Sequence, residues 1–354
     1  MSQGQPLTIA APNRMRRVKL TAAAILIVPL ATLVIAEITA RAFGYGRRIT
    51  FIKPEPPIYT PDDVIGWRPV PGRYRFGPYT PGSAAVEVTI RDDGARETGS
   101  GQGAGRPQVL LVGCSFTMGW AVADDDTWAW HLQQLRPDVE VVNRGVAGYG
   151  TLQPLLLLEQ LLGRDGQRPS RVLYGFIEQH ELRNVADRSW LFALAATPHL
   201  AATPYCTLTA DHRLERHRPI AYPSMPLHRY LASMVALELT LFDWRAPERS
   251  QSMDEVTEQL IAEMAALCRT HGVDFSLVIL NAPQTIAAKY RLYAEQHQID
   301  VIDCNQQLTP GDRVPGDGHP TGAVHRRWGD CIAAALADPQ RMPPPSSARV
   351  AARQ

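Results

Sequence analysis

The chain has 354 residues, with 36 basic and 35 acidic side chains and a formal net charge of +1 at pH 7. This balance gives no electrostatic reason to expect binding to nucleic acid or to another acidic polymer. The hydrophobic share of 45% is ordinary for a globular protein and excludes a fibrous or wholly disordered chain. The length accommodates one large domain or two smaller ones.

Residues 20–36 form an uncharged run of 17 residues that follows four basic side chains between Arg14 and Lys19. A bilayer is spanned by about 17–25 such residues. A cleavable signal peptide is the alternative, because Ala40-Arg41-Ala42 resembles a cleavage site. The run is long for a signal peptide's apolar core of about 7–15 residues. We therefore predict a cytoplasmic tail at 1–19 and an uncleaved single-pass anchor at 20–40.

The short basic tail is the easier side to leave in the cytoplasm. The sequence thus predicts a bacterial cytoplasmic-membrane protein whose bulk lies on the outer side, periplasmic or extracellular.

A linker and a small β add-on are expected at residues 41–105. Prolines at 54, 56, 57 and 61 predict an extended tether over residues 49–60. The alternating residues 86–90 read V-E-V-T-I, as in a half-exposed strand, and Asp92-Asp93-Gly94 predicts a turn after it. The glycine-rich stretch 99–105 predicts a flexible joint before the core domain.

The apolar residues 109–112 predict a strand that is buried on both faces of a parallel sheet. Gly113 ends this strand, Ser115 follows it, and residues 127–135 have the spacing of an amphipathic helix. Open α/β sheets place ligand chemistry between a strand end and a helix start. Ser115 is therefore a candidate nucleophile, with a simple turn or N-cap serine as the alternative.

Two later stretches supply what such a serine needs. Residues 141–151 predict a short strand that runs into a glycine-rich loop, and residues 316–321 read G-D-G-H-P-T. Side chains at i and i+2 of a loop can face the same side, so Asp317 could orient the imidazole of His319. A serine hydroxyl needs such a base to take its proton as it attacks.

Together, G-C-S-F-T at 113–117, the glycine loop and D-G-H-P-T resemble the SGNH (GDSL-type) hydrolase family over roughly residues 106–336. The resemblance implies a flavodoxin-like, three-layer α/β/α domain with a parallel sheet, placed at 106–338. It also implies catalytic Ser115, His319 and Asp317, with the N–H groups of Ser115 and Gly148 as oxyanion donors. No cofactor is implied.

The sequence departs from the family pattern at two places. Cys114 stands where the family usually has aspartate, which raises a thiol nucleophile as an alternative. The predicted strand 172–176 is followed by E-Q-H-E, where the family has G-x-N-D. By register Gln179 falls on the asparagine that donates to the oxyanion, and His180 is the alternate donor.

The rest of the chain continues the α/β pattern around one insertion. Residues 183–250, rich in arginine, histidine, proline and aromatic residues, predict a lid or substrate-facing subdomain, with a local core cluster as the alternative. Beyond it we predict a helix at 253–271, strands at 275–280 and 299–304, and a helix at about 323–336 on which His325 is structural. Residues 339–354 predict a disordered tail.

Five cysteines are spaced without a CxxC or Cys/His pattern, so no metal site is predicted. Their odd number argues against a full disulfide framework, although one pair could bridge in an exported domain. Cys268 and Cys304 are expected to be small buried hydrophobes.

The function predicted from these residues is that of a serine esterase or O-acyltransferase. Its expected substrates are acyl groups, foremost acetyl, on envelope or secreted carbohydrate, processed through an acyl-enzyme. The altered third block motivates a different class, a catalytically impaired polysaccharide-binding or assembly component. A lipid-directed esterase is a third possibility. The expected partners are an acylated carbohydrate or other ester, and the membrane.

Overall fold

The computed structural model describes residues 14–46, 56–99, 105–163, 168–196, 202–222, 225–228, 230–245 and 249–338. The chain divides into two compact units: Met1–Ile49 with Pro223–Ala246, and Thr50–Tyr222 with Pro247–Gln354. The predicted tail 339–354, most of the predicted tail 1–19 and most of the glycine joint 99–105 lie outside the described residues.

The second unit is built on a parallel sheet. Within the described residues this sheet has five strands in the order β11-β10-β7-β5-β6. If these five strands are numbered 1 to 5 in chain order, the sheet reads 2-1-3-4-5 from β6 to β11. This is the predicted flavodoxin-like arrangement. The strands are β5 (Gln108–Gly113), β6 (Glu140–Asn143), β7 (Arg171–Ile177), β10 (Asp274–Asn281) and β11 (Asp300–Asp303).

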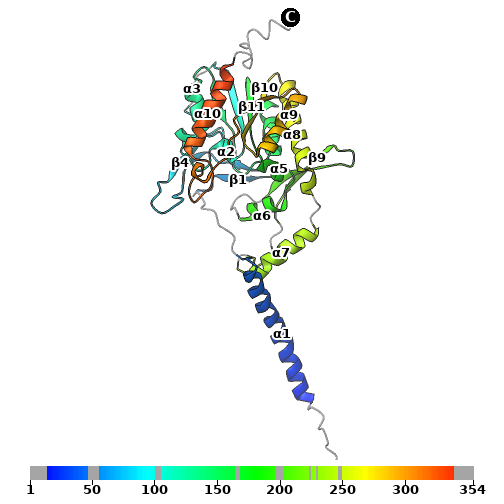
Figure 1. Cartoon of the computed structure of the whole chain (residues 1–354). Coiled ribbons are helices and arrows are strands. Elements are labelled where there is room, and N and C mark those ends of the chain that lie inside the picture. Colours follow the sequence, from blue (N-terminus) through cyan, green and yellow to red (C-terminus); the bar gives the residue numbers. More distant parts are fainter. Residues whose placement is uncertain are drawn as a thin grey trace, which may run out of the picture. The chain divides into compact units, whose positions relative to one another are not determined.

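Helices cover both faces of this sheet, so the predicted three-layer α/β/α fold is confirmed (Figure 1). Apolar side chains on α8 recur at Val256, Leu260 and Met264, the spacing of one helix face, and pack on the sheet. One face carries α4 (Leu152–Leu162), α8 (Met253–Thr270) and α9 (Gln284–Gln296), and the other carries α3 (Trp128–Leu135) and α10 (Gly322–Ala337).

The small β add-on belongs to the same compact unit as the sheet. The predicted tether ends earlier than expected, because Tyr59 is buried, begins β1 and accepts a hydrogen bond from the Ala147 N–H on its hydroxyl. Arg96 forms a β-bridge with Asn143 at the end of β6. The unit therefore includes residues before the predicted boundary at 106. The add-on strands pair as β1 (Tyr59–Asp62) with β2 (Gly66–Pro69) and β3 (Gly72–Phe76) with β4 (Val86–Ile90).

The predicted insertion 183–250 is divided between the two units. Cys206 of β8 is buried in the core cluster that covers one face of the sheet, so this part of the insertion contributes to the core. A lid role stays a prediction. The remaining elements of the second unit are α2 (Ser115–Met118), α5 (Gln179–Asn184), α6 (Arg188–Ala196), the hairpin of β8 (Thr203–Leu208) and β9 (Leu214–Ile220), and the short 3-10 turns Asp124–Asp126, Arg249–Ser252 and Pro310–Asp312.

The first unit contains α1 (Arg14–Ala42) and α7 (Ala232–Arg245). Within α1, Val18–Ala42 is a stretch of 25 residues that is long and apolar enough to cross a membrane, and an 18-residue window in it has a mean hydropathy of 2.3. The helix is thus longer than the uncharged run 20–36. By length and composition alone, a signal sequence passes the same test.

A disulfide joins Cys304, just after β11, to Cys331 on α10, with the Cα atoms 5.9 Å apart. The interpretation of Cys304 as a small buried hydrophobe was therefore wrong, because α10 packs back beside the end of β11 and brings a second thiol to it. All five cysteines lie in described parts of the chain, and Cys114, Cys206 and Cys268 are free and buried.

Candidate active site

Ser115 is the first residue of α2 and lies directly after β5. Its neighbours in the sheet are β6 on one side and β7 on the other, so Ser115 lies where the strand order reverses. This switch point is the usual ligand-binding position of an open α/β sheet. Only 3% of Ser115 is exposed.

Two glycines allow α2 to lie this close to the sheet and to the loop after β6. A Cβ atom on Gly175 of β7 would lie 2.2 Å from the Thr117 hydroxyl, and one on Gly145 would lie 2.4 Å from the Met118 nitrogen. Neither position has room for a side chain. The sequence therefore permits a one-turn helix here only because both positions are glycine.

Side chains from three other segments bind the carbonyl groups at the C-terminal end of α2. A helix end leaves such carbonyls without intrahelical partners, and a four-residue helix has little stability of its own. The long-range bonds thus hold Ser115 in place. They are Trp128 Nε1 to Phe116 O at 3.1 Å, Asn143 Nδ2 to Thr117 O at 2.9 Å, Arg96 to Met118 O at 3.1 Å, and Arg96 to Gly119 O.

Ser115, His319 and Asp317 lie in one hydrogen-bonded line. The Nε2 atom of His319 is 3.0 Å from Ser115 Oγ, and its Nδ1 atom is 2.6 Å from Asp317 Oδ1. A carboxylate beside Nδ1 favours the tautomer that carries its proton there. Nε2 is then free to accept the proton of the serine hydroxyl. The structure thus brings together the three residues that the sequence singled out.

Asp317 is held ionised by its partners. Burial opposes its charge, but hydrogen bonds and the positive charge of His319, together with the bond from Trp120, lower its pKa below the usual value. Trp120 Nε1 donates to Asp317 Oδ2 at 3.3 Å. Burial together with the negative charge of Asp317 raises the pKa of the Tyr79 phenol, so Tyr79 lies within electrostatic reach of this carboxylate.

The residues that support the triad include three that the sequence did not single out. Arg96 and Tyr79 come from the add-on region, and Trp120 follows α2 by two residues. The ring of Phe76 on β3 packs 4.3 Å from that of Trp120, so the add-on supports the side chain that binds Asp317. Only Trp120 carried a signal, its nearness to G-C-S-F-T.

The main-chain donors proposed for an oxyanion are available. Among the described residues, no acceptor is bonded to the N–H of Ser115 or of Gly148. Gly148 has φ of +84°, a conformation that favours glycine. Both N–H groups are therefore free to bind a ligand oxygen.

The two candidates for a side-chain donor have other partners. Gln179 Nε2 donates to Glu178 Oε1 at 3.0 Å. His180 is fully buried, with Nδ1 2.6 Å from the Tyr174 hydroxyl, and burial moves its pKa far below the ordinary value. It is a neutral ring that packs against Tyr174 and Phe176 of the central strand β7. A role for either residue at an oxyanion stays a prediction.

Cys114 is fully buried, and its thiol interacts with the guanidinium of Arg183. The imidazole of His319 contacts Ser115 instead. Within the part of the chain that the structure describes, the imidazole that would serve as base is therefore paired with Ser115 and not with the thiol.

His325 is fully buried as well, with Nδ1 3.4 Å from the Trp128 N–H. Burial foremost lowers its pKa to about 3. It is a neutral core residue between α10 and α3, in agreement with the structural role expected from the sequence.

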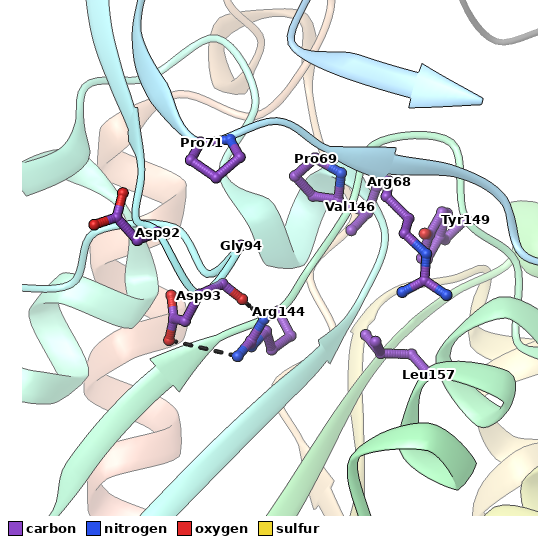
Figure 2. A pocket seen from close by; sticks show the side chains of 10 residues that line it. All are labelled: Arg68, Pro69, Pro71, Asp92, Asp93, Gly94, Arg144, Val146, Tyr149 and Leu157. Carbon is purple, nitrogen blue, oxygen red and sulfur yellow. Dashed lines mark hydrogen bonds and ion pairs between the residues drawn. The ribbon is translucent and has the colours of Figure 1, made fainter. Parts of the chain in front are cut away.

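A cavity of about 210 Å³ lies behind the glycine loop (Figure 2). Arg144 binds the turn at Asp93 here, with 3.4 Å between its guanidinium and the carboxylate. Neither Ser115 nor His319 lines this cavity. The cavity is lined by Arg68, Pro69, Pro71, Asp92, Asp93, Gly94, Arg144, Val146, Tyr149 and Leu157.

No group of three or more His, Cys, Asp or Glu suited to a metal occurs among the described residues.

No family model matches the chain, and no curated protein matches it. Among solved structures, it is similar to a lipolytic protein of the G-D-S-L family from Veillonella parvula, with 11% identity over 65% of this chain and 98% of the other, at a TM-score of 0.38. It is also similar to the psychrotrophic esterase EstA from Pseudoalteromonas, with 10% identity over 65% and 96% of the two chains, at 0.37. A third similar structure is AlinE4, an SGNH-hydrolase family esterase, with 13% identity over 68% of this chain and 100% of the other, at a TM-score of 0.34. These are distant likenesses.

Proposed function

We propose that this protein is a serine ester hydrolase of the SGNH type, with Ser115 as nucleophile, His319 as general base and acid, and Asp317 as the group that orients His319. One observation carries the proposal: His319 lies 3.0 Å from the Ser115 hydroxyl through one ring nitrogen and 2.6 Å from Asp317 through the other. A histidine that only occupies a loop does not need both ring nitrogens bonded, one to a serine hydroxyl and the other to a carboxylate.

The reaction follows from this geometry. Ser115 Oγ attacks the acyl carbonyl carbon while its proton moves to His319 Nε2. The carbon–oxygen bond to the leaving alcohol breaks as Nε2 returns that proton to the alcohol. The oxygen of an acceptor hydroxyl then attacks the acyl carbon and gives its proton to Nε2. Nε2 passes this proton to Ser115 Oγ as the bond between the acyl carbon and Oγ breaks, which releases the product and restores the free serine. Asp317 stays ionised and stabilises the imidazolium.

The negative charge that develops on the carbonyl oxygen needs donors that are already in place. The N–H groups of Ser115 and Gly148 are the two main-chain candidates. Gln179 could add a third donor if its amide turned from Glu178 to the substrate, since Gln179 is the residue in register with the family asparagine.

We further propose that the enzyme acts outside the cytoplasm on acyl groups of envelope or secreted carbohydrate, with water or a sugar hydroxyl as acceptor. The apolar helix α1 supports attachment to the bacterial cytoplasmic membrane. The Cys304–Cys331 disulfide supports an oxidising compartment, where such bonds persist. A carbohydrate substrate and an acetyl group remain the expectation drawn from this location.

The activity is tested with the full chain in detergent and p-nitrophenyl acetate as substrate. Ser115→Ala should lower kcat by about 10³-fold or more, since it removes the nucleophile. Cys114→Ser is the matched control on the neighbouring residue and should retain most of the activity. Equal rates for the parent chain and Ser115→Ala would refute the hydrolase and favour the binding component.

The substrate class is tested separately by competition between an O-acetylated polysaccharide and esters of long-chain fatty acids. Release of acetate from the polysaccharide, absent in Ser115→Ala, is the expected result. Preference for long acyl chains would instead identify a lipid-directed esterase. Acetyl transfer to a sugar acceptor in place of acetate release would identify an O-acetyltransferase.

A further inference from the structure

The end of α1 is joined to a helix that lies 190 residues later in the chain. The carboxylate of Glu37 accepts hydrogen bonds from the N–H groups of Ala232 at 3.0 Å and Ser233 at 2.9 Å, the first two residues of α7. The Ser233 hydroxyl donates to the same carboxylate at 2.8 Å. These are N–H groups that a helix start leaves without partners, so Glu37 caps α7 from another helix.

A second hydrogen bond lies at the same joint, because the Arg41 guanidinium donates to the main-chain carbonyl of Tyr230 at 3.5 Å. Arg41 binds Glu37 one turn earlier in α1 at 2.7 Å. Ala40 is only 6% exposed, although most of α1 is exposed. The residues that resemble a cleavage site thus lie within α1, shortly after Glu37 and its bonds to α7. This arrangement suits a permanent anchor better than a removable leader.

Large apolar side chains are exposed around this joint. Beyond the C-terminal end of the apolar span, the first unit exposes Phe43 by 77%, Tyr230 by 75%, Leu227 by 59%, Leu237 by 43% and Tyr45 by 40%. Among the described residues of the much larger second unit, only Val64, Leu135 and Leu292 are similarly exposed large apolar side chains. An exposed apolar cluster of this kind marks an interaction site.

The position and chemistry of this cluster identify what covers it. It lies at the end of α1, which is the one helix in the described part of the chain that is long enough to cross a bilayer, and Figure 1 shows α7 beginning beside that end. Tyrosine side chains are enriched where a membrane helix leaves the bilayer, and Tyr45 and Tyr230 are both exposed at this end. The carboxylate of Glu238 inside the apolar helix α7 is fully buried, where it accepts the Met225 N–H at 2.7 Å. The carboxylate of Glu238 would therefore not be transferred from water to lipid if α7 lay on a membrane.

We propose that α7, together with Phe43, Tyr45, Leu227 and Tyr230, is a second membrane contact that lies in the headgroup region of the leaflet where α1 ends. Its partner is the phospholipid bilayer itself. An apolar helix that lies in the interface buries its exposed side chains about 5–10 Å deep. The proposal rests on α1 as a membrane anchor and is independent of the ester chemistry.

The test uses the full chain reconstituted in vesicles of phosphatidylcholine and phosphatidylglycerol. Single cysteines replace Leu237 on α7, Leu292 on α9 and Val34 within the span, and each carries a bimane label. The parent chain, whose free cysteines are buried, serves as the unlabelled control. Quenching is measured with a lipid that carries a nitroxide near its headgroup, and separately with iodide in water.

The label at Leu237→Cys should be quenched by the lipid nitroxide and protected from iodide, as at Val34→Cys. The label at Leu292→Cys should behave in the opposite way. Quenching at Leu237→Cys by iodide alone would overturn the proposal, and protection from both quenchers would overturn it in favour of a protein partner. If the protein purified from membranes lacks its first 40 residues, α1 is not a permanent anchor and the proposal fails with it. Ester hydrolysis by the same preparation would leave the proposed function intact.

Discussion

Arg96 donates a hydrogen bond of 3.1 Å to the main-chain carbonyl of Met118, the last residue of the helix that presents Ser115. Its side chain is fully buried and also binds Gly119 O, Val122 O at 2.7 Å and the Asp124 carboxylate at 3.1 Å. A single cation from the add-on region thus holds the turn that follows the nucleophile.

Replacing Arg96 by Met should destabilise the fold strongly, because it removes the Arg96 hydrogen bonds to three carbonyl groups and the ion pair with the Asp124 carboxylate. We expect a loss of about 3–5 kcal/mol in the free energy of unfolding. The urea midpoint of the full chain in detergent measures it. Arg91→Met is the matched control: its ion pair with Asp93 is partly exposed, so it should cost no more than about 1 kcal/mol. Similar midpoints for the two variants would contradict the role of Arg96.

Asp317→Asn should lower kcat for p-nitrophenyl acetate by about 10⁴-fold, as the equivalent change does in other serine triads. The amide cannot stabilise the imidazolium and favours the wrong tautomer of His319. Circular dichroism of the variant should be unchanged. A loss of less than tenfold would show that Asp317 does not act through His319.

The pKa of Asp317 also predicts a pH dependence of stability. Its folded pKa lies below the usual value near 3.8, so the ionised carboxylate stabilises the fold above that pH. This contribution is lost as the pH falls through the folded pKa. The Asn variant lacks it and should therefore lose less stability than the parent chain between about pH 5 and pH 2. If the stability of the parent chain and of the Asn variant fell in parallel over this pH range, the lowered pKa of Asp317 would be contradicted.

Trp120→Phe should keep the aromatic packing on Phe76 while it removes the hydrogen bond to Asp317. One such bond is worth about 0.5–1.5 kcal/mol, so kcat/KM should fall by up to about tenfold. The pKa of Asp317 should rise towards its usual value, which moves the acid limb of the stability curve to higher pH. An unchanged acid limb would mean that the bond, 3.3 Å long, contributes nothing.

Cys331→Ser should lower the free energy of unfolding by about 3–4 kcal/mol, because the disulfide closes a loop with a sequence separation of 27 residues. Thermal unfolding of the parent chain with and without a reducing agent measures the same difference. Activity should persist in Cys331→Ser at low temperature, since neither cysteine contacts the triad. A reducing agent should leave the melting temperature of the variant unchanged.

The strands, the main helices and the triad residues follow from the sequence because each depends on neighbours close along the chain. The apolar run 109–112 requires a buried strand, and the spacing of Val256, Leu260 and Met264 requires a helix face. Asp317 and His319 are two positions apart, so their contact needs only a local loop. The resemblance to a known family then linked Ser115 to that loop.

Only the tertiary structure decided which distant groups surround the site. Arg96 and Tyr79 are unremarkable in the sequence, and Trp120 is marked only by its nearness to G-C-S-F-T. All three acquire their roles because the add-on packs against α2 and the loop of Asp317. The Cys304–Cys331 bridge and the bonds from Glu37 to α7 likewise join segments whose separation along the chain carries no signal. Local sequence determines which elements form, whereas the burial of their apolar faces determines which elements become neighbours, and these contacts exist only after that packing.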